Sequence, residues 1–338
     1  MELAGSLYPD HMEFKYPKAG EDNAKVTIHI YDLSAKSTQM ADVGEEVDQY
    51  IPRIKWTQDN SQLAVIRMNR LQNKVDVLLV DAKEGSSKVI LTEESETYIK
   101  EPADDTWHFL AGGNEFLWRS ERSGFNHIYR FNMAGEMVET VTEGEWEVDE
   151  LIGVDETNQV IYYTSTEESP LERHLYKIGM DGKKKKQLTK IAGTHNVEAS
   201  SAFTYFVDSY SNTATPTITA LKDAKGKTIR ILEENNRLKK NYARHKLADP
   251  EFFSFAYTPS YRGENNEVIS LNGFMIKPSD FDETKQYPVL MFVYGGPGSQ
   301  EVMNAWGHGD AFNYMWFQML AQIGYIIACV DNRGTGGR

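Results

Sequence analysis

A repeat of strand patterns with a period close to 47 residues constrains the fold of this chain more than any other feature. The segment HIYRFNMAGEMVETVTEG, which begins at His127, returns as HLYKIGMDGKKKKQLTKI at His174. Weaker copies of the same pattern begin at Thr27, Val75 and Thr217. Within each copy apolar and polar residues alternate with a period of two, which is the pattern of a β-strand with one buried face.

Each copy ends in a hairpin, and another strand pair precedes it. Turn sequences such as AKEG, MAGE and DAKGK join the last two strands, while residues 54–69 and 105–121 each read as strand, polar turn and strand. Four short strands in about 47 residues are typical of a propeller blade. Stacked two-layer sandwiches would also contain many short strands, but they would not give so regular a period.

We therefore predict an all-β propeller, incomplete, with about four to five four-stranded blades, over residues 1–250. Because His127 and His174 occupy the same position of the repeat, we expect both to make the same structural contact in their blades rather than to act in catalysis.

The pattern changes from residue 251 onward. FFSFAYTPS and VISLNGFMIKPSDFD read as a strand pair around the turn RGENN, and YPVLMFVYGGPGSQ begins with a continuous apolar strand expected to be buried on both faces of a sheet. AFNYMWFQMLAQIG then has apolar residues at helical spacing, and YIIACVDNRGTGGR supplies another buried strand. The apolar positions of that helix include Phe312, Met315, Trp316, Met319 and Leu320. Residues 251–338 are thus predicted to begin a doubly wound α/β domain.

The segment VYGGPGSQ places Tyr294 between this apolar strand and a Gly-Gly-Pro-Gly turn. Its glycines tolerate positive φ and allow another group to approach the backbone closely. The carboxyl end of a buried strand is where α/β enzymes place functional groups. The residues alone are equally compatible with an ordinary loop and with Tyr294 as a half-buried aromatic at a strand end.

Composition and motif spacing exclude several classes of function. The net charge of −14 argues against binding to nucleic acid or to anionic lipid, and we interpret the run Lys183–Lys186 as a solvated hairpin. No apolar run approaches the ~18 residues of a membrane span, and the first residues lack the pattern of a signal peptide. Cys329, the single cysteine, rules out a disulfide within the chain. No cluster has metal-ligand spacing and NRGTGG lacks a phosphate-loop pattern, so we expect neither metal nor cofactor.

Four segments give the chain a resemblance to a known family. They are YPKAGEDN (16–23), SERSGFNHIY (120–129), YPVLMFVYGGPGSQ (287–300) and DNRGTGGR (331–338). With these segments the chain resembles the serine peptidases of the prolyl oligopeptidase family, and more narrowly their bacterial dipeptidyl peptidase IV branch. The resemblance implies an eight-bladed propeller and an α/β-hydrolase domain, each incomplete in this chain.

The resemblance also implies an activity. Members of this branch are serine-type exopeptidases that release an N-terminal dipeptide from a peptide with Pro or Ala in the second position, without a cofactor. By the same resemblance we expect a periplasmic or cell-envelope location, and a full-length protein that can form a homodimer.

The family motif assigns one catalytic role within this chain. The tyrosine after the strand supplies an oxyanion donor, and it corresponds to Tyr294. The family places its Ser–Asp–His triad downstream of Arg338, and no Gly-x-Ser-x-Gly sequence occurs in the 338 residues. Its paired glutamates would lie upstream of Met1; Glu2 and Glu13 are not adjacent and do not take that role. We therefore expect a fragment lacking both ends and inactive by itself, with other substrate-binding residues unassigned.

Two other interpretations remain open from the sequence. One is a relative of the acylaminoacyl or prolyl endopeptidases, which would lack the paired glutamates. The other is a non-catalytic propeller that binds a partner and carries a decayed hydrolase portion as a scaffold.

Overall fold

Antiparallel sheets of four strands recur along most of the chain, as predicted for propeller blades. The computed structural model describes residues 2–3, 7–8, 10–16, 18–245, 247–258, 268–309 and 311–337. The chain divides into two compact units, and each is described by itself below. The first contains Met1–Phe116 and Phe131–Glu136, and the second contains Leu117–Arg130 and Met137–Arg338. The domain boundary predicted near residue 250 was based on a change in strand pattern. The compact units divide at other positions of the chain, so this domain boundary stays a prediction.

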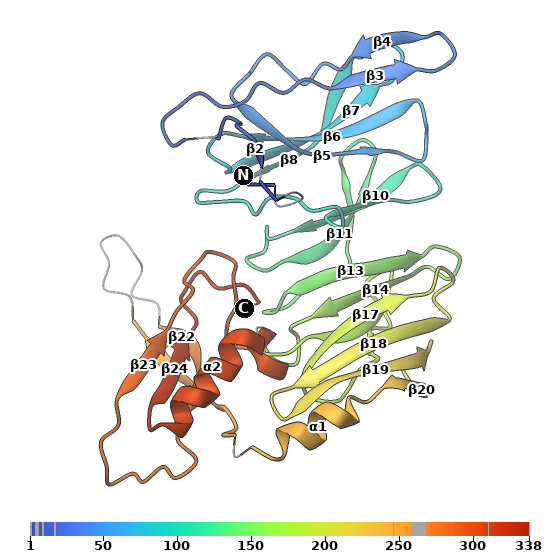
Figure 1. The fold of residues 1–338 in the computed structure, drawn as a ribbon. Helices are drawn as coiled ribbons and strands as arrows, with labels where there is room; N and C mark the ends of the chain where they lie inside the picture. Colours follow the sequence, from blue (N-terminus) through green and yellow to red (C-terminus); the bar gives the residue numbers. More distant parts are fainter. Residues whose placement is uncertain are drawn as a thin grey trace. The chain divides into compact units, whose positions relative to one another are not determined.

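The first unit contains two short strand pairs and one complete four-stranded sheet, in the order β5-β6-β7-β8. The strand pairs are β1 (Glu2–Leu3) with β2 (Asp10–His11), and β3 (His29–Asp32) with β4 (Ser37–Met40). The sheet consists of β5 (Gln49–Trp56), β6 (Gln62–Asn69), β7 (Lys74–Asp81) and β8 (Ser87–Glu94). Ile30 of the β3–β4 hairpin packs with Val65 and Leu78 of the sheet, beside which the hairpin lies (Figure 1). Burial does not alternate along the two central strands, contrary to the period of two: residues 63–66 of β6 and 75–80 of β7 are buried without a break, so both faces of these strands are covered.

A second four-stranded sheet, in the order β12-β11-β10-β9, is crossed by the boundary between the units. Its strands are β9 (Trp107–Phe109), β10 (Glu115–Ser120), β11 (His127–Asn132) and β12 (Met137–Thr140). On the part that belongs to the first unit, Phe116 stacks on Phe131 with ring centroids 5.6 Å apart.

The second unit continues with two more four-stranded sheets, in which each strand pairs with the next along the chain. They comprise β13 (Val148–Asp155), β14 (Val160–Ser165), β15 (His174–Gly179) and β16 (Lys186–Gln187), then β17 (Thr194–Ala199), β18 (Tyr205–Asn212), β19 (Thr215–Asp223) and β20 (Thr228–Glu233). The two sheets share one core, in which Tyr162 and Leu175 of the first pack with Val197 and Phe206 of the second. Face-to-face packing of consecutive sheets is the arrangement that propeller blades require.

The repeated turns have a common physical cause. Asp32, Asp81, Asn132 and Asp223 each stand at the start of a hairpin turn and accept backbone N–H groups from the following residues. These bonds hold the pKa of Asp32, Asp81 and Asp223 below the usual aspartate value. The side chain thus replaces a backbone partner in the turn, which is why Asp or Asn returns at this position in most of the hairpins. The turn between β15 and β16 has Gly179 there, and Asp181 accepts the N–H of Lys183 instead.

The equivalent contact predicted for His127 and His174 is confirmed. The backbone N–H groups of Ile128 and Leu175, which follow the two histidines, donate to the hydroxyls of Thr142 (2.9 Å) and Thr189 (2.8 Å). Nδ1 of His127 lies 3.1 Å from the Thr142 hydroxyl, and Nδ1 of His174 lies 3.1 Å from the carbonyl of Thr189. Both imidazoles are buried and tie the third strand of a blade to the segment after its fourth strand.

The C-terminal module is a mixed sheet in the order β21-β22-β24-β23. It follows helix α1 (Asn236–Tyr242), which lies beneath the preceding sheet in the view of Figure 1. Its elements are β21 (Glu251–Tyr257), β22 (Ile269–Ile276), β23 (Val289–Phe292), the 3-10 helix η1 (Trp306–Gly309), α2 (Ala311–Gln322) and β24 (Ile326–Val330). Strands β21 and β22 are antiparallel, as predicted, whereas β23 and β24 are parallel and joined by a crossover through α2. The predicted turn RGENN lies outside the described residues.

The burial predicted for the apolar strand was wrong for one of its faces. β23 is the edge strand of the described sheet, with Val289 and Met291 exposed. Leu290 and Phe292, which alternate with them, pack against the core beneath α2. A continuous apolar run shows that both faces can be buried, but actual burial requires a covering layer on each face.

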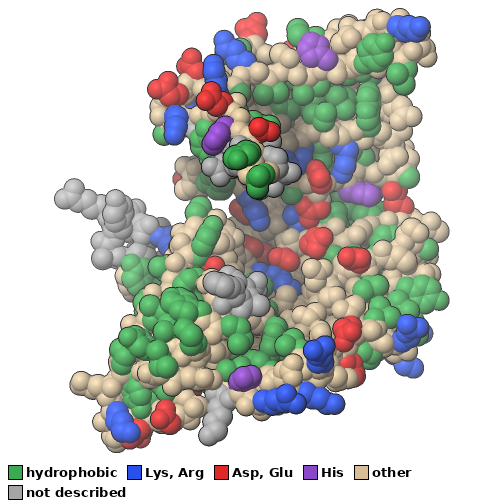
Figure 2. Space-filling view, in the orientation of Figure 1, with side chains coloured by type: hydrophobic (Ala, Val, Ile, Leu, Met, Phe, Trp, Pro, Cys, Tyr) green, Lys and Arg blue, Asp and Glu red, His purple; other side chains and the backbone are tan. Residues whose placement is uncertain are grey.

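The predicted helix is present as α2, but several of the apolar residues noted in its sequence lie on its exposed side. Met315, Trp316 and Met319 are exposed, whereas Tyr314 and Phe317 are among the residues that enter the core. Gln318 is buried as well, and its amide exchanges two hydrogen bonds of 2.9 and 2.8 Å with the backbone of Ala248. The described part of the helix is apolar on more than one side, so spacing alone did not identify the inward face. Figure 2 shows hydrophobic side chains gathered over this C-terminal module.

Cys329 lies buried in β24, and burial raises the pKa of its thiol to about 12. Lys183–Lys186 are exposed, in agreement with a solvated hairpin. Within the described ranges, none of the helices is long and apolar enough to cross a membrane.

Candidate functional site

Two glycine-rich loops leave the carboxyl ends of neighbouring parallel strands. One follows β23 and carries Tyr294, and the other follows β24 and begins at Asp331. The register of the two strands, with Phe292 opposite Cys329, brings both loops to the same edge of the sheet. This edge is where α/β proteins bind ligands and place catalytic groups.

Tyr294 projects from the first of these loops and is 68% exposed. Its hydroxyl makes no hydrogen bond to the residues that the structure describes. The ring lies against the backbone of Gly296, where a Cβ atom would come within 2.6 Å of the ring atom Cε1. Gly295 has a φ of +75°, in the left-handed region that favours glycine. The loop therefore has no side chain on the backbone beside the tyrosine ring, and the tyrosine hydroxyl is free to donate a hydrogen bond to a bound group.

Hydrogen bonds join the two loops to each other. The Asn332 amide donates to the carbonyl of Gly295 (3.0 Å), and the N–H of Gly298 donates to the carbonyl of Gly334 (2.8 Å). The Thr335 hydroxyl donates to the carbonyl of Ser299 (2.6 Å). These bonds satisfy backbone groups that a loop far from regular structure would otherwise leave to water.

A buried carboxylate fixes the chain where it leaves the first loop. Asp331 is 7% exposed and accepts the N–H groups of Glu301 (2.9 Å) and Val302 (3.1 Å). The N–H of Asp331 itself donates to the carbonyl of Asn272 (3.0 Å). The end of β24 thereby sets the position of the segment that follows Gln300.

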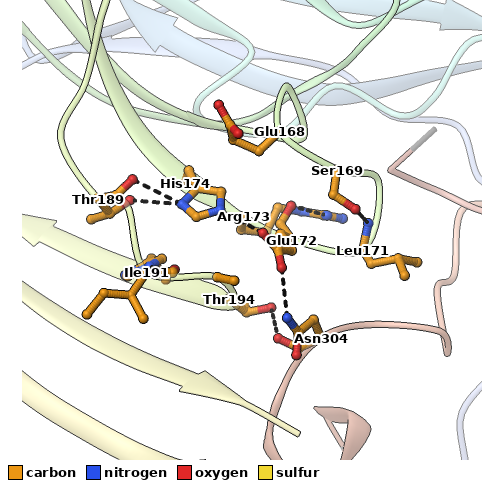
Figure 3. Close-up of polar contacts among 12 residues, drawn as sticks. Glu168, Ser169, Leu171, Glu172, Arg173, His174, Thr189, Ile191, Thr194 and Asn304 are labelled. Atoms are coloured by element: carbon orange, nitrogen blue, oxygen red, sulfur yellow. Dashed lines mark hydrogen bonds and ion pairs between the residues drawn. The ribbon is translucent and has the colours of Figure 1, made fainter. Parts of the chain in front are cut away.

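The loops are bonded to the blade formed by β13–β16, mainly through the segment between β14 and β15, residues of which are labelled in Figure 3. The buried Arg173 donates through Nη2 to the Gln300 side-chain oxygen (2.6 Å), while its Nε pairs with Asp149 (2.9 Å). The Gln300 amide donates in turn to the carbonyl of Pro170 (2.8 Å). The N–H of Gly337, in the second loop, donates to the Glu147 carboxylate (3.1 Å).

A second connection lies beside the first. Glu172 accepts from the Asn304 amide (2.7 Å) and from Nε2 of His174 (3.0 Å), and Figure 3 shows the Asn304 contact as a dashed line. The N–H of Asn304 donates to the carbonyl of Leu171 (2.8 Å), and its own carbonyl accepts from the Thr194 hydroxyl (3.2 Å). Burial raises the pKa of Glu172, but the hydrogen bonds from His174 and Asn304 outweigh it and hold that pKa below the usual value. Glu172 is thus ionised at neutral pH, with one hydrogen bond to each carboxylate oxygen.

Of the residues discussed from sequence, the structure brings Tyr294 and both glycine loops to one site. Sequence reasoning missed Glu172, Arg173 and Asn304. A signal was present, because the repeat has Asn126 at the position of Arg173. Asn126 bonds to the carbonyl of Val148 at the start of β13 (2.9 Å), whereas Arg173 reaches Gln300, 127 residues away, so the change to arginine marks a blade with an additional contact. Across the described residues, no group of three or more His, Cys, Asp or Glu side chains is arranged to hold a metal ion.

Comparisons with known proteins agree with this architecture. Residues 1–217 match the model of the dipeptidyl peptidase IV (DPP IV) N-terminal region. The chain is 30% identical to dipeptidyl peptidase 4 of Trichophyton rubrum, with 97% of this chain and 42% of that protein covered. It is 31% identical to a probable dipeptidyl-aminopeptidase B of Emericella nidulans, with 97% and 37% covered.

A solved structure matches over nearly the whole chain. The crystal structure of Porphyromonas gingivalis dipeptidyl peptidase 4 superposes with a TM-score of 0.88 at 37% identity, covering 99% of this chain and 46% of that one. The chain therefore spans about two fifths of the length of its curated relatives, and the four-stranded sheets are confirmed as propeller blades.

Proposed function

Because the chain belongs to the dipeptidyl peptidase IV family, we propose that it is part of a serine-type exopeptidase. The whole protein would release N-terminal X-Pro or X-Ala dipeptides from peptides. In this proposal residues 251–338 begin an α/β-hydrolase domain of the prolyl oligopeptidase type. The parallel pair β23–β24 and its crossover helix α2 support that assignment.

The observation that carries the proposal is the placement of Tyr294. Its hydroxyl is exposed and free of hydrogen bonds to described residues, at the carboxyl end of a parallel strand. The two loops around it are bonded to each other and to a blade, so the tyrosine stands on a fixed base. Peptide hydrolysis through an acyl-enzyme needs donors aimed at the oxygen that becomes negative in the tetrahedral intermediate.

In the proposed reaction, a serine attacks the carbonyl after the second substrate residue while a histidine removes the serine proton. The phenol O–H of Tyr294 donates to the resulting oxyanion. Residues 1–338 contain no Gly-x-Ser-x-Gly sequence, so the serine of this scheme is assigned outside them. This chain's own contribution is the oxyanion donor, the loops that hold it, and propeller surface beside the site.

The test is hydrolysis of a Gly-Pro chromogenic amide by the protein in its natural full length. Tyr294→Phe removes only the hydroxyl, so we expect kcat to fall by ~10²–10³, the usual cost of one oxyanion donor. Tyr205→Phe is the matched control, since Tyr205 is an exposed tyrosine on β18, and it should leave kcat unchanged. Equal activity of Tyr294→Phe and wild type would contradict the role of Tyr294.

A second substrate separates the proposal from an endopeptidase. An exopeptidase that reads a free amino terminus should cleave the Gly-Pro amide and leave its N-acetylated form intact. Cleavage of the acetylated amide would instead indicate an acylaminoacyl or prolyl endopeptidase. Failure to cleave either amide would favour a binding protein.

Location and assembly are part of the same proposal. From the resemblance we propose a periplasmic or envelope location and a homodimer of the full-length protein. Cell fractionation and light scattering of the purified protein test these two points, and a cytoplasmic monomer would contradict both.

A further inference from the structure

We propose that Arg173 is a positioning residue for Tyr294, acting from the propeller through Gln300. This inference rests on the proposed function, because it assigns a role in the same reaction. It adds that the rate of the reaction depends on a blade residue that is itself buried beneath the loops.

The first step is that, among the described residues, the hydrogen bonds of residues 293–299 run within the Tyr294 loop or to the second glycine loop, and none reaches a blade. Val293 and Tyr294 are both exposed, and Gly295 and Gly298 have positive φ values of +75° and +73°. Residues of this kind do not hold a single backbone conformation by themselves. The loop must therefore take its position from bonds made by its neighbours.

The second step is that Gln300 is the loop's attachment to the blade. Its side-chain N–H groups donate to the carbonyls of Pro170 (2.8 Å) and Val302 (3.1 Å), and its oxygen accepts from Arg173 (2.6 Å). One amide side chain thus bonds both to the segment before β15 and to the backbone that leaves the loop. It lies six residues after Tyr294 in the sequence.

The third step is that Arg173 is held from several sides. Besides Gln300, its guanidinium donates to Asp149 (2.9 Å) and to the carbonyls of Pro170 (3.2 Å) and Glu172 (3.0 Å). Its side chain is only 8% exposed. A buried guanidinium with four acceptors in a fixed fork has little freedom to move, which makes it a rigid support for Gln300.

The second glycine loop closes over this contact. A Cβ atom on Gly337 would come within 2.6 Å of both Arg173 Nη2 and the Gln300 oxygen. Gly337 also has a φ of +83°, so a side chain at this position would be strained as well as crowded. Both loops at the carboxyl edge of the sheet therefore converge on the same pair of side chains.

The test uses the full-length protein and the variant Arg173→Lys. Lysine keeps the charge that Asp149 pairs with, but a single ammonium cannot serve all four acceptors of the guanidinium. A loop displaced by about 1 Å can cost up to ~10²-fold in rate, so we expect kcat on the Gly-Pro amide to fall about 10- to 100-fold with little change in KM.

The control is Arg67→Lys. Arg67 pairs with Asp76 (3.0 Å) and donates to the carbonyl of Val43 (3.0 Å). The same substitution therefore removes a guanidinium that also bonds to a carboxylate and a backbone carbonyl, but whose partners are not residues of the glycine loops. This variant should keep the wild-type kcat even where it lowers the melting temperature. The comparison separates loss of positioning from loss of general stability.

A double-mutant cycle distinguishes positioning from a structural role. If Arg173 acts through the Tyr294 hydroxyl, Arg173→Lys should change kcat by less than about twofold in a Tyr294→Phe background. Should Arg173→Lys fail to fold, Gln300→Met removes the same link with a side chain of similar length and should show the same kcat loss and the same cycle.

Each outcome decides between the claims. An active wild type, a slow Tyr294→Phe and an unimpaired Arg173→Lys would refute the positioning role alone. An equal loss from Arg173→Lys with and without the Tyr294 hydroxyl would refute its action through that hydroxyl. A wild type that cleaves no Gly-Pro amide would refute the proposed function, and the positioning role with it.

Discussion

Substituting Gly296 by alanine tests the geometry of the Tyr294 loop more finely than removing the hydroxyl does. An added Cβ would lie 2.6 Å from Cε1 and 3.2 Å from Cδ1 of the Tyr294 ring, closer than the ~3.5–4.0 Å at which carbon atoms pack. The φ of Gly296 is outside the left-handed region, so alanine adds no backbone strain. Relief requires the exposed ring to move by about 1 Å, which carries the hydroxyl with it.

The expected effect is on catalysis rather than on stability. Because the ring is exposed and can rotate away, the free energy of unfolding should change by no more than about 0.5 kcal/mol. A displacement of about 1 Å in a catalytic donor can reduce kcat by up to ~10²-fold. The assay is hydrolysis of the Gly-Pro amide by the full-length protein, with the melting temperature measured in parallel.

The matched control is Gly334→Ala in the second loop. A Cβ there meets only the Asn332 side-chain oxygen at 3.6 Å, an ordinary contact, and the φ of Gly334 is also outside the left-handed region. This variant should keep both activity and stability. Full activity of Gly296→Ala, or an equal loss in both variants, would refute the reasoning from the ring contact.

Two further predictions concern carboxylates of the second unit that accept hydrogen bonds, the buried Asp208 and the partly buried Glu172. Burial raises the pKa of Asp208, but bonds from His195 (2.9 Å) and Lys222 (2.6 Å) hold it below the usual value, and the pKa of Glu172 is lowered in the same way. A carboxylate whose pKa is lower in the folded state contributes stability at pH values above its unfolded pKa of ~4. The melting temperature should therefore be constant near neutral pH and should fall as the pH drops below about 4.5. A melting temperature that stays constant down to about pH 3 would contradict this prediction. Asp208→Asn leaves Lys222 buried without its anion and should cost about 3–5 kcal/mol in chemical denaturation, whereas an unchanged midpoint would show that the pair is dispensable.

The blades could be predicted from sequence because their signals are local. Asp81 bonds to the N–H groups of Lys83 and Glu84, only two and three residues away, so the turn is encoded where it forms. His127 and Thr142 are also close in sequence, and their spacing returns with His174 and Thr189. A pattern with a fixed period can be recognised in the sequence without knowledge of the tertiary structure.

The support of the candidate site could not be predicted in this way. Arg173 and Gln300 are 127 residues apart, and no local pattern links an arginine in a blade with a glutamine after a glycine loop. Tyr294 itself was assigned by resemblance, because its own residue environment is equally compatible with an ordinary loop.

The inward face of α2 was unpredictable for a different reason. Met315 and Met319 have the same spacing as Tyr314 and Gln318, and the polar Gln318 is the residue that turned inward. Its two bonds to Ala248 depend on a backbone segment 70 residues away. Burial of a polar side chain is favourable only where such partners exist, and the sequence does not show where they are.

The most direct measurement of the central claim is a crystal structure of the full-length protein with a dipeptide boronic acid that has proline in the second position. A serine adduct of this inhibitor is tetrahedral and carries an oxygen where the oxyanion would form. The proposed role of Tyr294 predicts that its hydroxyl lies about 2.7–3.1 Å from that oxygen. A hydroxyl turned away from the adduct, with the oxygen held by other groups, would contradict the assignment of Tyr294 as the oxyanion donor.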